Sequence, residues 1–402
     1  MPQTPPPPQH PIRHRVETTF RQRFKADPEI LVRAPGRINL IGAHVDHSEG
    51  WVLPGAIDRA VWLAARPARD EAAATVVAVD LDDEATLDAA AIPPPVTERP
   101  APKAEWIDYP RGVAWALTRA GHPPPGLDVV FAGDVPMGGG VSSSAAVEVA
   151  FLTAWNELAG SPLDRVTLAR LGRRAENGYL GVASGLMDQY ASLHGRAGHL
   201  LLLDCRRLEH REVPLPPGLA VVVFDSGVSR TLAGSSYNDR PRECAEALEV
   251  LRRRLSDART LRDVSLEDLD RWEGDLAPPL DRRARHVVEE CARVLRGAEA
   301  LAAGDVAACG RLIDGSHASS RDLFEVSVPE LDCLAAAATA ADGCYGARLS
   351  GAGFGGCAVA LVEQDAVTAV VEAVRDAFHD RFDRRPEWFE CSIADGAQCW
   401  RL

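Results

Sequence analysis

The sequence has no apolar run of about 20 residues, the length that a membrane-spanning helix requires. Its N-terminus has no hydrophobic core for a signal peptide. Residues 1–14 are proline-rich, and we expect a disordered or polyproline-II tail there. The nine cysteines are odd in number and form no CxxC pair, so we interpret them as reduced, mostly buried thiols and not as a disulfide framework or zinc site. These absences predict a cytoplasmic protein with no membrane partner.

Basic residues are also scarce relative to acidic ones. The 402 residues include 44 Lys and Arg against 58 Asp and Glu, a formal net charge of −14. This balance argues against nucleic-acid binding but leaves room for a local phosphate pocket. No GxxxxGK[ST] segment occurs, which excludes a Walker P-loop, and no HRD or DFG segment occurs, which excludes a protein kinase.

What is present fits a globular protein of mixed structure. With 46% hydrophobic and 25% charged residues, a chain of this length favours two domains. Residues 127–133 are strand-like, and apolar residues at helical spacing predict a helix that begins at Ser142–Ser144. Helices and strands interleave without a fixed βαβ period, which predicts an α+β fold. We expect an N-terminal domain over 15–210 and a C-terminal domain over 211–402.

The segment GGGVSSSAA lies between that strand and that helix. Glycines let the backbone approach an anion, free N–H groups at a helix start favour phosphate, and serine hydroxyls add donors or a magnesium ligand. A flexible loop with a serine N-cap explains the local pattern equally well. Taken alone, the segment indicates a phosphate site without deciding it.

The segment RAPGRINLIGAHVDH follows an extended stretch at 30–32 and contains many turn-forming residues. It gathers four polar side chains within eleven residues: Arg37, His44, Asp46 and His47. Such a cluster on a loop is a candidate functional site. A metal site made from its two histidines and its aspartate would lack the spacing of ligands on one helix face.

The segment ENGYLGVASGLMDQYASLHG places Glu176 and Asp188 twelve residues apart, with Gly181 and Gly185 between them. The two carboxylates could be a metal ligand and a general base. Spacing alone favours the simpler interpretation that both are surface charges.

In their order along the chain, the three segments resemble the signatures of the galactokinase family, within the galactose, homoserine, mevalonate and phosphomevalonate kinases. RLSGAGFGGCAVAL is similar to the family's C-terminal glycine motif, and GLMDQ, LLLDC and YNDRPREC agree as well. The resemblance runs from about residue 20 to the C-terminus. It implies two domains with the active site in the cleft between them, a sugar and ATP as partners, Mg²⁺ as cofactor, and a monomer or homodimer.

The resemblance also implies roles for individual residues. Asp188 would be the general base for the anomeric C1 hydroxyl, and Arg37 would keep it ionised and offset charge on the transferring phosphoryl group. Ser144 and Glu176 would be magnesium ligands. The phosphates would be wrapped by Gly138, Gly139, Gly140, Ser142, Ser143 and Ser144. The sugar-contacting positions would be Ala43, His44, Asp46, Gly185, Asp188 and Tyr237. Trp106 is a candidate for adenine stacking, although a packing role explains it equally well.

The sequence departs from most galactokinases at one position, where GEHxDY is replaced by GAHVDH and Ala43 stands in place of glutamate. The lost carboxylate is the group expected to bind the sugar C6 hydroxyl. A uronic acid carries its own carboxylate at C6, and two such charges about 4 Å apart would cost about 4 kcal/mol at an effective dielectric of about 20.

GAHxDH is similar to the galacturonokinase branch, so the sequence predicts a galacturonokinase that makes galacturonate 1-phosphate from galacturonate and ATP. Candidate cations for the uronate carboxylate are His47 and Arg230. Galactokinase is the alternative, and an arabinose kinase is a third. A non-catalytic sugar and ATP sensor is a further alternative, but such proteins typically damage the catalytic residues, which are intact here.

Overall fold

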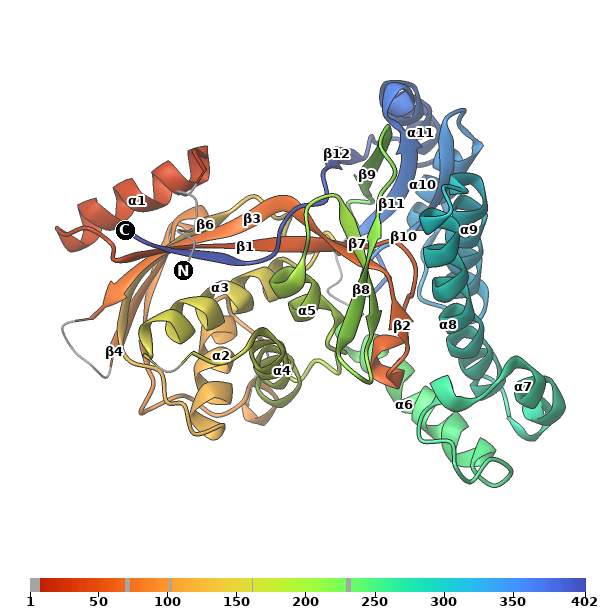
Figure 1. Ribbon diagram of the computed structural model, residues 1–402, viewed down its shortest axis with the longest axis horizontal. Coiled ribbons are helices and arrows are strands. Elements are labelled where there is room, and N and C mark those ends of the chain that lie inside the picture. Colours follow the sequence, from red (N-terminus) through yellow and green to blue (C-terminus); the bar gives the residue numbers. More distant parts are fainter. Residues whose placement is uncertain (1–7, 69–72, 101–102, 161, 229–232) are drawn as a thin grey trace.

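The computed structural model describes all residues except 1–7, 69–72, 101–102, 161 and 229–232 (Figure 1). Its helices are α1 (Pro11–Phe24), α2 (Asp108–Arg119), α3 (Ser143–Leu158), α4 (Arg165–Ala175), α5 (Met187–His194), α6 (Ala233–Leu251), α7 (Leu266–Trp272), α8 (Leu280–Ala302), α9 (Val306–Asp322), α10 (Pro329–Ala340) and α11 (Val367–Phe382). Its strands are β1 (Ile30–Asn39), β2 (Trp51–Val52), β3 (Pro54–Pro67), β4 (Ala73–Ala78), β5 (Asp83–Asp88), β6 (Leu127–Gly133), β7 (His199–Asp204), β8 (Glu209–Pro214), β9 (Leu219–Asp225), β10 (Cys344–Leu349), β11 (Cys357–Glu363), β12 (Glu387–Cys391) and β13 (Gln398–Arg401).

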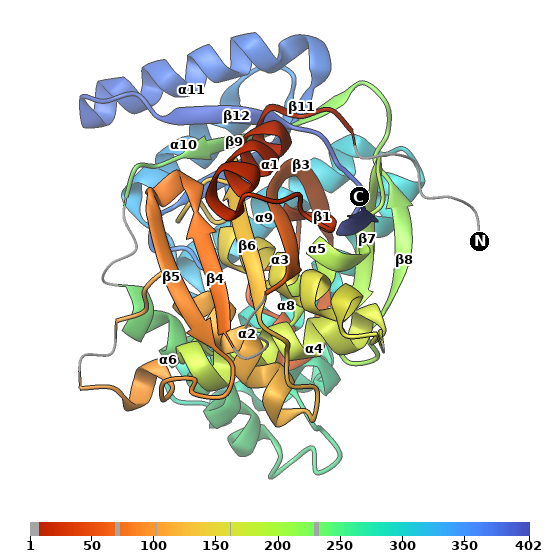
Figure 2. The same cartoon turned by 90° about the vertical axis from the view of Figure 1, so that its left-hand side faces the viewer.

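The described part of the chain contains three sheets. A six-stranded sheet has the order β13-β1-β3-β6-β4-β5, a four-stranded sheet has the order β10-β11-β9-β12, and a three-stranded sheet has the order β2-β7-β8. Figure 1 shows α2, α3, α4 and α5 on one side of the six-stranded sheet and α1 on the other. Figure 2, turned by 90°, shows α11 and α10 beside the four-stranded sheet. The predicted strand at 127–133 and the helix that begins at the serines are both confirmed.

The first strand is longer than the sequence predicted. We expected an extended stretch only at 30–32, followed by turns, but β1 continues to Asn39 and pairs with β3, with a register shift between Pro35 and Arg37. Gly36 explains how the strand passes this point. A Cβ there would lie 2.7 Å from the Val141 carbonyl oxygen. Only glycine therefore allows β1 to approach the glycine- and serine-rich segment at 138–144, which we call the phosphate loop. Arg37 therefore projects from a strand and not from a turn.

The N-terminal tail is shorter than predicted. Residues 1–7 lie outside the described residues, but α1 begins at Pro11, within the stretch expected to be disordered. Proline is favoured in the first helical turn, and the His10 side chain caps the helix by accepting from the Ile12 N–H. Val16 and Phe20 are fully buried against the six-stranded sheet, and this burial stabilises the helix.

The proposed boundary between residues 210 and 211 stays a prediction. Residue 210 lies inside β8, and β13, from the far end of the chain, pairs with β1. The six-stranded sheet is thus completed by a segment that we had assigned to the C-terminal domain.

Candidate active site

Most of the site residues predicted from the sequence line one cavity of about 540 Å³. The following predicted residues line it: Arg37, Ala43, His44, Asp46, Gly138, Gly140, Ser142, Ser143, Ser144, Glu176, Gly185, Asp188 and Tyr237. Among the residues to which the resemblance gives a role, Gly139 and Trp106 do not. Gly139 packs instead near Cys357, where an added Cβ would lie 3.2 Å from the sulfur, and Trp106 lines a neighbouring cavity.

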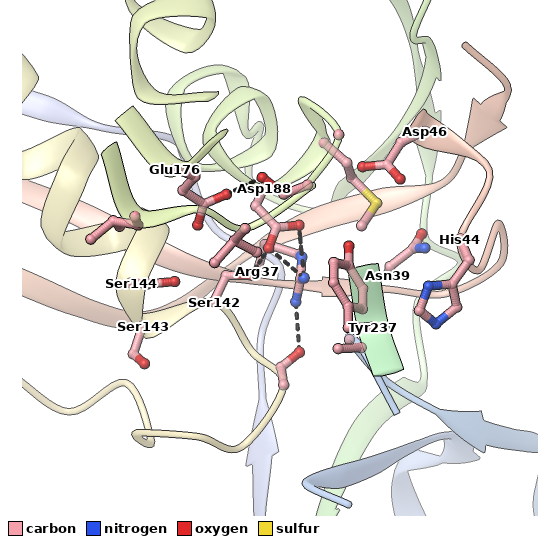
Figure 3. A pocket seen from close by; sticks show the side chains of 18 of the residues that line it. Arg37, Asn39, His44, Asp46, Ser142, Ser143, Ser144, Glu176, Asp188 and Tyr237 are labelled. Atoms are coloured by element: carbon pink, nitrogen blue, oxygen red, sulfur yellow. Dashed lines mark hydrogen bonds and ion pairs between the residues drawn. The ribbon is translucent and has the colours of Figure 1, made fainter. Parts of the chain in front are cut away.

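Asp188 and Arg37 form the centre of this site (Figure 3). Asp188 lies in the first turn of α5, and Arg37 lies near the end of β1. The Arg37 Nε donates to Asp188 Oδ1 over 2.8 Å and its Nη2 donates to Oδ2 over 2.7 Å, while Nη1 donates to the Gly140 carbonyl over 2.6 Å. The Ser142 hydroxyl also donates to Asp188. A bidentate guanidinium pair of this kind fixes the orientation of the carboxylate.

The phosphate loop lies beside this pair. Gly138 and Gly140 have φ angles of 73° and 76°, and Ser142 has a φ of 61°, so the chain turns sharply into α3. The first turn of α3 presents Ser143 and Ser144 to the cavity. Unpaired N–H groups at a helix N-terminus favour anions, so this wall of the cavity suits a phosphate chain.

Glu176 faces the same cavity from a short π-helical segment, Glu176–Leu180, that follows α4. Its carboxyl accepts a hydrogen bond from the Ser184 hydroxyl. Burial, and then the charge of Asp188, raise the pKa of Glu176 to about 7. A π-helical turn often marks a functional site, and here it turns the carboxyl toward Asp188.

Asp46 lies toward the other end of the cavity, in the 3₁₀ turn Asp46–Ser48. A Cβ at position 185 would lie only 2.0 Å from Asp46 Oδ2, so Gly185 allows this carboxyl to pack against the backbone beside Asp188. Burial, and then the charge of Asp188, raise the pKa of Asp46. Asp46 and Gly185, both predicted as sugar-contacting positions, thus lie against each other.

His44 and Tyr237 complete this end of the cavity. The His44 ring lies 5.8 Å from the Tyr237 ring and 4.9 Å from the Phe324 ring. Burial, and then the charge of His286, lower the pKa of His44 well below its ordinary value, so its imidazole is neutral. Its Nε2 and the Oδ1 of Asn39 are buried and have no hydrogen-bond partner within the described part of the chain. Unpartnered buried polar atoms that line a cavity indicate a polar ligand.

Ala43 is held from behind by α8. The Glu290 carboxylate accepts from the Gly42 and Ala43 N–H groups, each over 2.9 Å, and His286 Nε2 donates to the Ala43 carbonyl over 2.9 Å. Burial acts in the opposite direction, but the nearby His286, Arg293 and Arg348 lower the pKa of Glu290 to about 2. The peptide at position 43 is therefore fixed on both sides by fully buried groups.

Of the two residues proposed to bind a uronate carboxylate, His47 does not provide a cation. Burial, and then the charge of His286, lower the pKa of His47 to about 4, so it is neutral at physiological pH, and it does not line the cavity. Arg230 lies outside the described residues. A three-ligand metal site is also not formed: within the described ranges, no group of three or more His, Cys, Asp or Glu side chains is placed to hold a metal.

A second cavity, of about 450 Å³, shares Tyr109, Gly138, Ser143 and Ser144 with the first. Its wall includes Trp106, whose indole Nε1 donates to Asp83 Oδ2 over 2.8 Å. The two cavities thus meet at the phosphate loop.

Four residues that shape the site have no role predicted from the sequence: Asn39, Arg348, His286 and Glu290. The first two stood inside the quoted motifs, so their motif membership was the available signal. The last two lie about 250 residues from the loop that they hold, and no local pattern marks them.

Comparison with known proteins identifies the class of this chain. Residues 108–196 match the GHMP kinases N terminal domain, residues 298–380 match the GHMP kinases C terminal domain, and residues 18–67 match the galactokinase galactose-binding signature. A mevalonate kinase structure shares the fold, with a TM-score of 0.59 at 16% identity over 91% of this chain and 99% of that one. The chain therefore has the GHMP kinase fold, and the predicted two-domain fold of mixed helices and strands is confirmed.

Nearer relatives narrow the class. The galactokinase of Roseiflexus sp. (strain RS-1) is 47% identical over 94% of each chain, and that of Chloroflexus aurantiacus is 44% identical over 94% of this chain and 96% of its own. The structure of Lactococcus lactis galactokinase complexed with galactose superposes with a TM-score of 0.89 at 32% identity, covering 96% of this chain and 98% of that one. The chain belongs to the galactokinase family. The predicted family and enzyme class are confirmed, but the comparisons do not support a galacturonokinase. Within the described residues, no helix is both long and apolar enough to cross a membrane.

Proposed function

We propose that this protein is an ATP-dependent galactokinase that phosphorylates the C1 hydroxyl of galactose. The observation that carries the proposal is the position of Asp188. Its carboxylate is held by Arg37 and Ser142, with the phosphate-binding helix start on one side and the loop of His44 and Asp46 on the other, in one cavity. The galactokinase relatives and the galactose-binding signature at 18–67 support galactose as the sugar.

In the proposed reaction, Asp188 accepts the proton of the C1 hydroxyl while that oxygen forms a bond to the γ-phosphorus of ATP. The bond from this phosphorus to the β–γ bridging oxygen breaks, and its electron pair leaves with ADP. Positioning and electrostatic stabilisation supply most of the catalysis in phosphoryl transfer. The bidentate contact with Arg37 holds the Asp188 carboxylate in place at the cavity.

Glu176 and Ser144 are the residues that would hold Mg²⁺. A carboxylate and a hydroxyl on the wall of the cavity suit this ion, which commonly takes one or two protein oxygens and completes its shell with phosphate oxygens and water. When bound, the ion neutralises charge on the phosphate chain. The pKa of Glu176, raised to about 7, fits a cation-binding carboxyl, because a bound cation would favour its ionised form. The adenine would occupy the second cavity, beside Trp106.

Galacturonate remains the second candidate substrate, because the cavity wall carries the methyl group of Ala43 where a carboxylate was expected. An arabinose sugar, which lacks C6, would also tolerate this change. A sensor without catalysis is not favoured, since Arg37, Ser144, Glu176 and Asp188 all line the cavity. Cytoplasmic location and a monomeric or dimeric state stay predictions.

The first test compares kcat/KM for galactose, galacturonate and arabinose with Mg-ATP in one preparation. We expect the highest value for galactose. A tenfold preference for galacturonate would instead make this chain a galacturonokinase, and sugar binding without ATP consumption would make it a sensor.

The second test is Asp188→Asn, which keeps the shape but removes the base. We expect a 10²–10⁴-fold fall in kcat, the usual contribution of general-base catalysis, with galactose binding by calorimetry largely retained. A variant that kept more than about a tenth of the wild-type kcat would rule out this role for Asp188.

A further inference from the structure

Arg348, at the end of β10, is a buried guanidinium on the wall of the active-site cavity. It is 1% exposed. Its Nη1 donates to the Asn39 carbonyl over 2.9 Å, and this is the one hydrogen bond that it makes to the described residues. Its Nε has no partner there, and it forms no ion pair with any described carboxylate. Burial lowers the pKa of Arg348 to about 10, so the group still carries its charge at neutral pH.

A buried charge of this kind calls for a counter-ion. A guanidinium has five N–H donors, and charges in protein interiors are normally paired because desolvation is costly. Arg283, which is similarly buried at 2% exposure, follows the rule and pairs with both Glu243 and Glu325. Arg348 departs from it at a cavity wall, where a bound anion can supply the missing charge.

The charged side chains near Arg348 do not provide its counter-ion. Arg37 is neutralised by Asp188, so that pair contributes no net positive charge to the cavity. Glu290 attracts Arg348 electrostatically, but its carboxylate oxygens already accept from Arg293, Ser316 and two backbone N–H groups. Among the cavity-lining residues that the structure describes, Arg348 is thus the cation without a carboxylate partner.

The position of Arg348 ties it to the phosphate loop. Asn39, whose carbonyl it contacts, lies two residues after Arg37 on β1. Ser350, two residues after Arg348, donates to the Gly140 carbonyl over 3.2 Å, and the same carbonyl accepts from Arg37. The guanidinium therefore stands close to the place where the phosphate loop, Arg37 and β1 meet.

We propose that Arg348 donates hydrogen bonds to the anionic oxygens of the phosphoryl group during its transfer, as a second arginine of the reaction centre. This proposal rests on the proposed kinase function. As the C1 oxygen bonds to phosphorus and the bond to the ADP oxygen breaks, the three other phosphoryl oxygens carry negative charge, and Arg348 stabilises them without gaining or losing a proton. Fixed donors of this kind stabilise the transition state more than bound substrates, so the effect belongs mainly to kcat.

The test uses Arg348→Met and Arg348→Lys in the full-length protein, with Arg33→Met as the matched control. Arg33 is a partly buried arginine of β1 whose hydrogen bonds to the described residues also go only to main-chain carbonyls, those of Ile57, Asp58 and Asp395, but it does not line the cavity. We expect Arg348→Met to lower kcat by about 10²–10³-fold, the usual effect of losing one such donor. The KM for galactose should change less than about threefold, Arg348→Lys should fall between, and Arg33→Met should keep the wild-type kcat.

Chemical rescue by guanidinium ion distinguishes a direct role of the Arg348 side chain in the reaction from a structural role. In Arg348→Ala, guanidinium ion at low millimolar concentration should restore part of the lost kcat, because it can enter the space left by the side chain. This readout needs only a small folded fraction, and Arg33→Ala should show no such rescue.

An unchanged kcat in Arg348→Met or Arg348→Lys would overturn the proposal. So would a raised galactose KM at constant kcat, since Arg348 would then face the sugar and not the phosphoryl group. Failure of the proposed function is distinguishable, because the wild-type protein itself would then consume no ATP with galactose.

Discussion

Replacing Glu176 with glutamine should stabilise the ligand-free protein at alkaline pH and slow its turnover at least about 10²-fold. Glu176 is 7% exposed and faces the cavity beside Asp188. Burial, and then the negative charge of Asp188, raise its pKa from 4.5 to about 7. The ionised carboxylate therefore destabilises the empty fold, although it is the form that a magnesium ion needs. Glutamine keeps the shape and the oxygen that accepts from Ser184, but carries no charge.

The pKa shift sets the magnitude. A carboxyl group whose pKa is raised by folding binds more protons in the folded state, so the free energy of unfolding falls as the pH rises. The loss is absent below the unfolded pKa of 4.5, develops as the pH rises to about 7, and is complete above that. At about 1.4 kcal/mol per pKa unit, the full loss is about 3 kcal/mol. The variant should gain this amount over the wild type at about pH 8 and almost nothing near pH 4.5.

The assay is urea unfolding followed by circular dichroism between about pH 4.5 and 8, without nucleotide or magnesium. The control is Glu267→Gln, whose side chain is 82% exposed and whose effect should be small at every pH. Equal stability of Glu176→Gln and wild type at pH 8, or a difference that does not change with pH, would refute the reasoning. At pH 8 the variant should also turn over at least about 10²-fold more slowly, although it is more stable.

Three further substitutions test the geometry. Gly185→Ala should raise the galactose KM at least tenfold in steady-state assays while leaving the ATP KM unchanged, because its Cβ would lie 2.0 Å from Asp46 Oδ2. The control is Gly274→Ala, which should leave both KM values unchanged because its Cβ meets nothing within 4 Å. Gly36→Ala should lower the free energy of unfolding by about 1–3 kcal/mol through overpacking against Val141, measured by urea unfolding. His286→Phe should keep the ring contact with Phe324 but leave the Ala43 carbonyl without its hydrogen bond. We expect the free energy of unfolding to fall by about 1–3 kcal/mol and the galactose KM to rise. A variant with wild-type stability and wild-type KM would show that His286 does not position the loop at residue 43.

Regular elements with clear periodicity could be predicted from the sequence. The strand at 127–133 and the helix that begins near Ser143 stood out because apolar residues recur at strand and helix spacing. The continuation of β1 through Pro35 and Gly36 could not, because both residues are typical of turns. What holds them in a strand is pairing with β3 and the close approach of Val141, which are tertiary contacts.

The site was predictable in part, and for a different reason. Asp188 and Arg37 are 151 residues apart. Local pattern favoured a surface charge for Asp188 and placed Arg37 in a candidate functional cluster, and only the resemblance to the galactokinase family paired the two residues. The structure brings them into a bidentate contact in one cavity. The roles assigned to them stay proposals, and so does the choice of sugar.

Arg348 shows what local reasoning omits. It lies in a quoted glycine motif, but its burial and its missing counter-ion depend on β1, α8 and the phosphate loop together. Neither its burial nor its lack of a counter-ion can be predicted from the sequence.

The pairing of β13 with β1 has a consequence for synthesis. Val32 lies opposite Cys399 and Leu31 opposite Trp400, so the strand that carries Arg37 has an open edge until residues near 400 emerge from the ribosome. A nascent chain must therefore hold more than 350 residues with an unpaired β1 edge, a form prone to wrong strand pairing. Because β1 is made more than 350 residues before β13, the six-stranded sheet closes only after β13 has emerged. Yield should depend on chaperones that shield this edge during that interval.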